Sequence, residues 1–132
     1  MAIHRHSSGG PFEAKVGYSR AVAADGWLFV SGCTGADPRT GEVPADVEAQ
    51  CRNTLSTIER ALAHHGAGFA DVVRVTYMLP DRAQFEPCWP QLRAAFGDAP
   101  PAATMIECGL IGPEYLIEIE VTARLPGPPD TS

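Results

Sequence analysis

Strand-type and helix-type hydrophobic patterns follow each other along this chain. Residues 27–31, Trp-Leu-Phe-Val-Ser, form a continuous apolar strand, and residues 18–24 before them are a second strand candidate. Asp25 and Gly26 separate the two segments. This pair is typical of the two-residue turn of a β-hairpin, because both residue types tolerate positive φ. We therefore expect these two strands to pair with each other.

A helical pattern occupies residues 45–64. Its apolar positions are separated by four, four, three and four residues, which places them along one side of a helix. Gly66 and Gly68 follow, and glycine is common just after a helix because it accepts positive φ. We therefore predict one amphipathic helix that is capped by these two glycines. The apolar positions of its stripe are Val47, Cys51, Leu55, Ile58 and Leu62.

Strand and helix patterns continue in the second half of the chain. Residues 71–79 are rich in β-branched residues and form a third strand candidate. A second helix is expected to end at Phe96. Because proline suits the first turn of a helix and not its middle, the regular part should begin near Pro87, after an irregular turn. Two further strands, at residues 104–108 and 116–124, complete the predicted elements.

The predicted order is strand, strand, helix, strand, helix, strand, strand, which indicates an α+β domain. We expect this domain to span residues 1–126 and to be followed by a flexible tail at residues 127–132. Two helices cannot cover both faces of such a sheet, so they should cover one. In the last strand, Ile117 and Ile119 alternate with Glu118, which places the glutamate on the uncovered face. We expect that face to meet solvent or another subunit.

Composition and charge narrow the functional classes. The chain has 132 residues, of which 45% are hydrophobic, and a net charge of −6. An acidic chain without a basic stripe is a poor candidate for binding nucleic acid. No leader segment and no apolar run long enough to span a membrane is evident, so we expect a cytoplasmic protein. The cysteines form no C-x-x-C pair and are expected to be reduced and without a chemical role; they are Cys33, Cys51, Cys88 and Cys108.

The histidines do not indicate a metal site. His64 and His65 end the first helix, where an imidazole interacts favourably with the helix dipole. His4 and His6 belong to the mixed segment at the start of the chain and are expected to be surface residues. Because no further ligands stand at a matching spacing, we expect no metal.

Short motifs between residues 16 and 124 carry a family signal. They are Val-Gly-Tyr-Ser-Arg-Ala (16–21), Phe-Val-Ser-Gly (29–32), Asp-Pro-Arg-Thr-Gly-Glu (37–42), the helical segment 50–58, Asp-Val-Val-Arg-Val (71–75), and Ile-Glu-Ile-Glu (117–120) within the segment 101–123. In this order they resemble the Rid (reactive intermediate deaminase, YjgF) family. The resemblance implies a chorismate-mutase-like α+β fold and a homotrimer. It places the clefts between subunits, on the face that the helices leave bare.

The resemblance also implies a reaction. The best-known Rid proteins hydrolyse enamines and imines made by pyridoxal-phosphate enzymes, releasing ammonia and a keto acid, without metal or cofactor. In them an arginine pairs with the substrate carboxylate, and a glutamate and a carbonyl help to position water. Tyr18 and Glu118 match site positions of the family. Ala103 and Met105 stand where the family has that arginine and a common cysteine.

Departures from the family pattern bear on the substrate. Ala103 cannot bind a carboxylate, Met105 makes the site more apolar, and Trp89 stands where many members have asparagine. All three favour an apolar or aromatic ligand. Trp89 either lines the pocket or packs in the core of the second helix. Arg20, where the family often has glutamine, offers either a replacement positive charge or an ordinary solvated side chain.

Three functional hypotheses follow. The first is hydrolytic deamination of a small imine or enamine-like compound, with Glu118 and Tyr18 in catalysis. For this role Glu118 must be a partly desolvated carboxylate with a raised pKa and not a solvated strand residue. The second hypothesis is a binding protein with the same pocket, which sequesters a reactive or aromatic metabolite. The third, RNA cleavage, is disfavoured by the acidic charge. The residues expected to bind the ligand are Ala103, Met105, Arg20 and Trp89.

Overall fold

The computed structural model describes residues 2–127, which form one six-stranded sheet and two α-helices. The predicted order of elements is confirmed, with one additional strand at the N-terminus. Of the tail expected at residues 127–132, only Gly127 lies within the described residues. The strands are β1 (His4–His6), β2 (Ala21–Ala24), β3 (Trp27–Thr34), β4 (Val72–Leu79), β5 (Ala102–Glu107) and β6 (Glu118–Arg124), and the helices are α1 (Val47–His64) and α2 (Trp89–Phe96).

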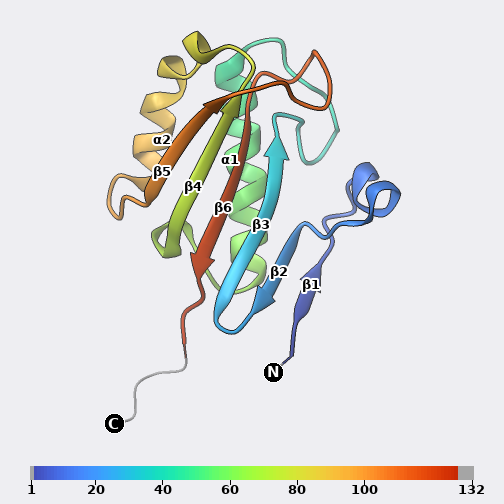
Figure 1. Cartoon of the computed structure of the whole chain (residues 1–132), viewed down its shortest axis with the longest axis vertical. Helices are drawn as coiled ribbons and strands as arrows, with labels where there is room; N and C mark the ends of the chain where they lie inside the picture. The colour runs from blue at the N-terminus through green and yellow to red at the C-terminus, as the bar shows by residue number, and fades with distance from the viewer. Residues whose placement is uncertain (1, 128–132) are drawn as a thin grey trace.

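The strands are arranged in the order β1-β2-β3-β6-β4-β5, so the last strand of the chain lies between β3 and β4. All neighbours are antiparallel except β4 and β5, which run parallel. Both α-helices lie on the same side of the sheet (Figure 1). The prediction that they cover one face is therefore confirmed. We call the opposite side of the sheet the bare face.

The hydrophobic core fills the space between the helices and the sheet. Cys51, Ile58 and Leu62, from the predicted stripe of α1, have no exposed surface. Leu28 on β3 and Ile119 on β6 meet them from the sheet and are equally buried. Full burial of one such aliphatic side chain stabilises the fold by about 1.5–3 kcal/mol. This packing fixes which side of each strand points toward the bare face.

Two predicted turns depend on positive φ. Asp25 and Gly26 have φ of 54° and 82° and join β2 to β3, as the sequence predicts. At the end of α1, Gly66 has φ of 73° and its N–H donates to the carbonyl of Ala63. The expected second cap is wrong. Gly68 has an extended backbone and precedes the next short helical turn. A second cap is not needed, because Gly66, which is left-handed, already ends the helix.

The prolines of the second helix lie where the backbone tolerates them. The short 3-10 turns Arg82–Gln84 and Glu86–Cys88 precede α2, and Pro87 belongs to the second of them. Regular helix starts at Trp89, and Pro90 falls in its first turn. The predicted irregular turn is thus confirmed, and the helix begins two residues later than expected.

His6 is not the surface residue that the sequence suggested. It pairs with Ala21 in the sheet and stacks on His64, at the end of α1, with 3.8 Å between the ring centroids. His65 contacts the same ring edge-on at 6.0 Å. Sequence reasoning missed this because a three-residue edge strand carries almost no periodic signal.

The histidine cluster predicts a pH-dependent stability. Burial, together with the charges of His64 and His65, lowers the pKa of His6 from its ordinary 6.5, although Glu13 opposes the shift. The folded state therefore binds a proton less readily than the unfolded state, and its stability should fall as pH drops below about 6.5. We expect the urea midpoint to fall between pH 7.5 and 5.5 in wild type, and to fall less in His6→Gln. His4→Gln serves as the exposed control, and an equal pH response in all three proteins would contradict the prediction.

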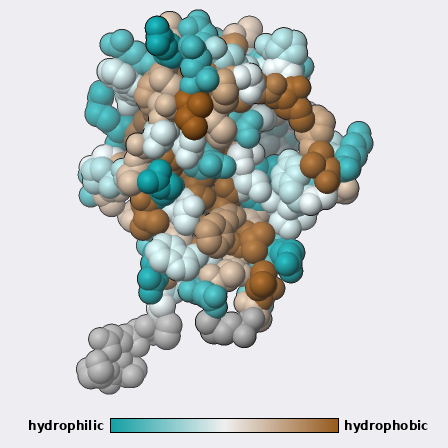
Figure 2. Space-filling model, in the orientation of Figure 1, coloured by the Kyte–Doolittle hydropathy of each residue, from teal (hydrophilic) through white to brown (hydrophobic). Residues whose placement is uncertain are grey.

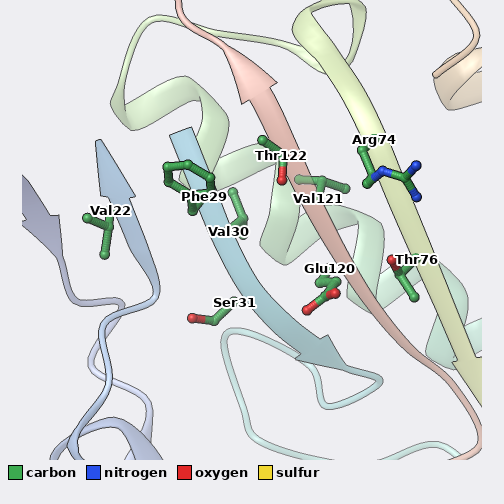
Figure 3. Close-up of a pocket in the computed structure, with 9 residues that line it drawn as sticks. All are labelled: Val22, Phe29, Val30, Ser31, Arg74, Thr76, Glu120, Val121 and Thr122. Atoms are coloured by element: carbon green, nitrogen blue, oxygen red, sulfur yellow. The ribbon is translucent and has the colours of Figure 1, made fainter. Parts of the chain in front are cut away.

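The bare face carries both apolar and charged side chains. Phe29 is 49% exposed on it, and Figure 2 shows brown apolar side chains among paler ones over this side of the molecule. A hollow of about 320 Å³ lies here, and in Figure 3 Glu120 lies between Ser31 on β3 and Thr76 on β4. Apolar area of this kind on an uncovered sheet is typical of a surface that meets another subunit.

Candidate functional site

Glu118 begins β6 on the bare face, as the alternation in the sequence predicts. It pairs with Thr34 on β3 and with Met78 on β4, and its side chain is half-buried. Burial raises the pKa of its carboxyl group, and the charge of Glu120 raises it further, while Arg20 opposes the shift. A carboxyl group with a raised pKa is a better proton acceptor than an ordinary glutamate and can return the proton it accepts.

An irregularity in β3 makes room for this carboxylate. Val30 pairs with Val121 and Cys33 pairs with Ile119, so two residues of β3 stand opposite the single Glu120 of β6. This is a β-bulge. One of the two bulged residues is Gly32, and a side chain at that position would overlap the carboxylate of Glu118. The glycine is therefore required by the position of Glu118, not by its own backbone angles.

Arg20 holds the bulge in place. Its Nη1 donates to the carbonyl of Gly32 at 2.9 Å, to the carbonyl of Ser31 at 3.4 Å and to the Sγ of Cys33 at 3.3 Å. The residue is only 8% exposed. The guanidinium of Arg20 is thus hydrogen-bonded to groups of its own chain. Neither sequence alternative for Arg20, a free replacement charge or a solvated side chain, fits this position.

Tyr18 is attached to the same network. Its hydroxyl accepts a hydrogen bond from Nη2 of Arg20 at 3.2 Å, and the guanidinium lies 5.4 Å from the centre of its ring. Because the hydroxyl accepts from Arg20, its own proton remains available for another acceptor. We call Glu13, Tyr18, Arg20, Gly32 and Glu118 the Glu118 cluster.

Ala103 and Met105 lie on the other side of the sheet. They pair with Val75 and Tyr77, which are buried under the helices, and Met105 packs against the core. Their expected place on the bare face is therefore wrong. Parallel pairing with β4 fixes which face of the sheet each β5 side chain lies on. Because both faces of β5 carry apolar residues, the sequence pattern does not show which face packs against the helices.

Trp89 lines an apolar groove between α2 and the sheet. It is 43% exposed, so it is a wall of this groove and not a core residue. Its ring meets Phe85 edge-on with 6.0 Å between centroids, and Phe85 lies 5.1 Å from Tyr77. The volume of the groove is about 320 Å³. We call it the α2 groove; it is lined by Tyr77, Phe85, Trp89, Leu92 and Arg93.

One chain therefore does not bring the six predicted site residues together. Tyr18, Arg20 and Glu118 belong to the Glu118 cluster. Trp89 lines the α2 groove, and Ala103 and Met105 lie on the same helical side of the sheet, where Met105 pairs with Tyr77 of that groove. Glu118 lies on the bare face, whereas Ala103 and Met105 lie on the opposite face of the same sheet. The two sets can share a cleft only if they come from different copies of the chain.

Sequence reasoning missed Glu13. The residue precedes the predicted strands in a mixed segment, yet it is only 4% exposed, and its carboxylate lies 3.6 Å from Nε of Arg20. A buried glutamate is rare without a partner, but no periodicity marks such a position in a loop. Its significance depends entirely on the tertiary contact with Arg20.

The other reactive groups are unremarkable. Within residues 2–127 all four cysteines are free, Cys108 is the one that is not fully buried, and no cluster of three metal-ligating side chains is present. Burial raises the pKa of Cys33 to about 11, although Arg20 opposes the shift, so this thiol is protonated at neutral pH. No helix among the described residues is long and apolar enough to cross a membrane.

The sheet order, the helices on one face and the glutamate at the start of β6 define a single α+β unit of the YjgF type. The family model described as Endoribonuclease L-PSP matches residues 10–125. The chain therefore belongs to this family, the YjgF/Rid family.

Relatives and solved structures agree with this assignment. A RutC family protein of Pyrococcus horikoshii is 36% identical over 107 residues, which cover 80% of this chain and 85% of that protein. The 2-iminobutanoate/2-iminopropanoate deaminase of Escherichia coli is 30% identical over 113 residues, which cover 80% of this chain and 85% of the enzyme. The crystal structure of Rv2704 from Mycobacterium tuberculosis, a member of the YjgF/YER057c/UK114 family, has a TM-score of 0.85 at 38% identity, and the match covers 94% of this chain and all of that one.

Proposed function

We propose that the protein is a cytoplasmic hydrolase that converts a small imine or enamine-like compound into a carbonyl compound and ammonia, without metal or cofactor. The observation that carries the proposal is the half-buried Glu118, with its raised pKa, over the bulge at Gly32. The similarity to an Escherichia coli protein named as an iminobutanoate deaminase supports it.

The proposed reaction needs only water and one proton carrier. The oxygen of water adds to the imine carbon, and the π electrons of the C=N bond move to nitrogen while Glu118 accepts a proton from the water. Glu118 then returns the proton to the nitrogen of the resulting carbinolamine. Glu118 next accepts the proton of the carbinolamine hydroxyl and passes it to the same nitrogen. The C–N bond breaks as the C=O bond forms, ammonia leaves, and Glu118 is ionised again. Tyr18 donates its free hydroxyl proton to the substrate or the water and so orients it.

The proposed active site lies between two copies of a homotrimer. Glu118 is on the bare face, whereas Trp89 and Ala103 are on the helical side, so one copy supplies the proton carrier and its neighbour supplies the α2 groove. The exposed apolar side chains of the bare face favour such an association.

The proposed substrate is apolar or aromatic and has no carboxylate bound at Ala103. The α2 groove is mainly aromatic and aliphatic, with Arg93 as its charged residue. The Nη atoms of Arg20 donate to groups of its own chain, and its Nε faces Glu13, so this guanidinium is not offered to a substrate carboxylate. An aromatic ring can stack against Trp89 and Phe85 in this groove.

Ammonia release tests this substrate class. Freshly generated imines, aliphatic carboxylates beside aromatic or uncharged ones, are compared with wild type and Ala103→Arg. We expect wild type to prefer the aromatic or uncharged imines. We expect the new arginine to improve kcat/KM for carboxylates by about 10–100-fold, because a charge-assisted hydrogen bond contributes about 1.5–3 kcal/mol. Ala94→Arg, which adds the same charge at an exposed position of α2, is the control and should change nothing.

A second candidate function is sequestration of a reactive or aromatic metabolite. It is favoured by Ala103, because a site without a carboxylate anchor can hold a ligand without orienting it for attack. Saturable binding of an aromatic imine analogue, without ammonia release from any member of the panel, would establish this function in place of hydrolysis. RNA cleavage, which the name of the family model suggests, should weaken steeply with salt if it occurs.

A further inference from the structure

Glu13 is a buried member of the Glu118 cluster, and its carboxylate is surrounded by donors. The N–H groups of Ser8 and Gly10 donate to it at 3.1 and 3.2 Å, and the hydroxyl of Ser8 donates as well. Burial by itself would raise the pKa of Glu13, but these hydrogen bonds and the charge of Arg20 outweigh it and lower the pKa. Glu13 is therefore a carboxylate at neutral pH.

Arg20 needs this negative charge. Its Nη atoms donate to carbonyl, thiol and hydroxyl groups and to no carboxylate. Its Nε is buried and makes no hydrogen bond within residues 2–127, and it faces Glu13 at 3.6 Å. A buried cation is tolerated when a counter-ion lies close to it. Glu13 supplies that charge from the π-helical turn Glu13–Gly17.

We propose that Glu13 is a positioning residue for the reaction at Glu118. It fixes Arg20, and Arg20 binds both the hydroxyl of Tyr18 and the carbonyl of Gly32, the residue over which the Glu118 carboxylate lies. The effect on turnover rests on the proposed function. The positions and charges of the network do not, and they can be measured without a substrate.

The network also determines the charge that Glu118 experiences. The charged or titratable groups around it are Arg20, Glu120 on β6 and Cys33 on β3, while its neighbour on β4, Met78, is uncharged. Glu13 cancels part of the positive charge of Arg20. Removing the carboxylate of Glu13 should therefore lower the pKa of Glu118, whereas removing the guanidinium of Arg20 should raise it.

The two variants thus differ in sign, which a general loosening of the fold cannot reproduce. The pKa of Glu118 is followed by NMR of its carboxyl carbon in wild type, Glu13→Gln, Arg20→Gln and the double variant. The resonance is assigned by its loss in Glu118→Gln. We expect the pKa of Glu118 to move downward in Glu13→Gln and upward in Arg20→Gln. The double variant should return toward wild type, and Glu59→Gln, at an exposed position of α1, should leave the pKa unchanged.

Each outcome decides the proposal. Equal pKa values in wild type and Glu13→Gln, or shifts of the same sign in both single variants, would overturn it. If Glu13→Gln does not fold, Glu13→Asp retains the charge and must leave the pKa of Glu118 near the wild-type value while Arg20→Gln raises it; any other result overturns the proposal.

Turnover separates this inference from the proposed function. If an imine is hydrolysed, the acid limb of the pH–rate profile should move with the measured pKa in each variant. If no imine is hydrolysed and the pKa values still move in opposite directions, the positioning network stands and the proposed function fails. If an imine is hydrolysed but the acid limb of the pH–rate profile is the same in Glu13→Gln and wild type, the proposed function stands and the positioning role of Glu13 fails.

Discussion

Glu118→Gln is expected to reduce kcat for imine hydrolysis by about 10²–10⁴-fold, which is the usual contribution of a positioned general acid–base group. Glutamine keeps the shape of the side chain over Gly32 but cannot accept the proton of the attacking water. The measurement is ammonia release at saturating substrate, with the imine that wild type prefers.

The same substitution should leave the fold intact or more stable. Burial raises the pKa of Glu118, so its ionised form is disfavoured in the folded state. The unfavourable contribution appears as pH rises through the raised pKa, and glutamine removes it. Higher thermal stability of Glu118→Gln at pH 8, together with lost turnover, would separate a catalytic role from a structural one.

Glu120→Gln is the matched control for this prediction. Glu120 lies on the same strand and the same face, in the hollow shown in Figure 3, but it does not lie over Gly32. We expect its effect on kcat to be at least tenfold smaller than that of Glu118→Gln. Equal losses in the two variants, or full activity of Glu118→Gln, would remove Glu118 from the mechanism.

Phe29→Asp should separate the subunits and abolish turnover together. Phe29 is exposed in the middle of the bare face, and an interface that buries it cannot accept an unpaired carboxylate without a large desolvation cost. Sedimentation should show the proposed trimer for wild type and a monomer for Phe29→Asp. In the proposed two-copy arrangement the monomer has no complete site, because Glu118 and the α2 groove lie on opposite sides of one sheet. Ammonia release should therefore fall to background.

Ile3→Asp provides the control, since Ile3 is similarly exposed, at 52%, but lies next to β1 at the far edge of the sheet. It should remain trimeric and active. A Phe29→Asp monomer that retains wild-type turnover would show that one chain contains the whole site, and the two-copy arrangement would have to be abandoned.

Local pattern was enough for much of the fold. The helical stripe of α1, the Asp25-Gly26 hairpin and the alternation in β6 are each set by neighbours in the sequence, and all three predictions are confirmed. β1 escaped prediction because three residues at a sheet edge have no period of their own. Its pairing with β2 and the stacking of His6 on His64 depend on contacts between distant segments.

The sequence by itself determined the family, the α+β order of elements and the side of the sheet on which Glu118 lies, because these follow from local periodicity and from short motifs. Only the tertiary structure decided how the candidate site is divided. Parallel pairing of β5 with β4 turned Ala103 and Met105 toward the helices, and the bulge in β3 directed Arg20 inward to Gly32 and Glu13. Strand register and the pairing of buried charges are set by contacts between segments far apart in the chain, so they cannot be predicted from local sequence patterns.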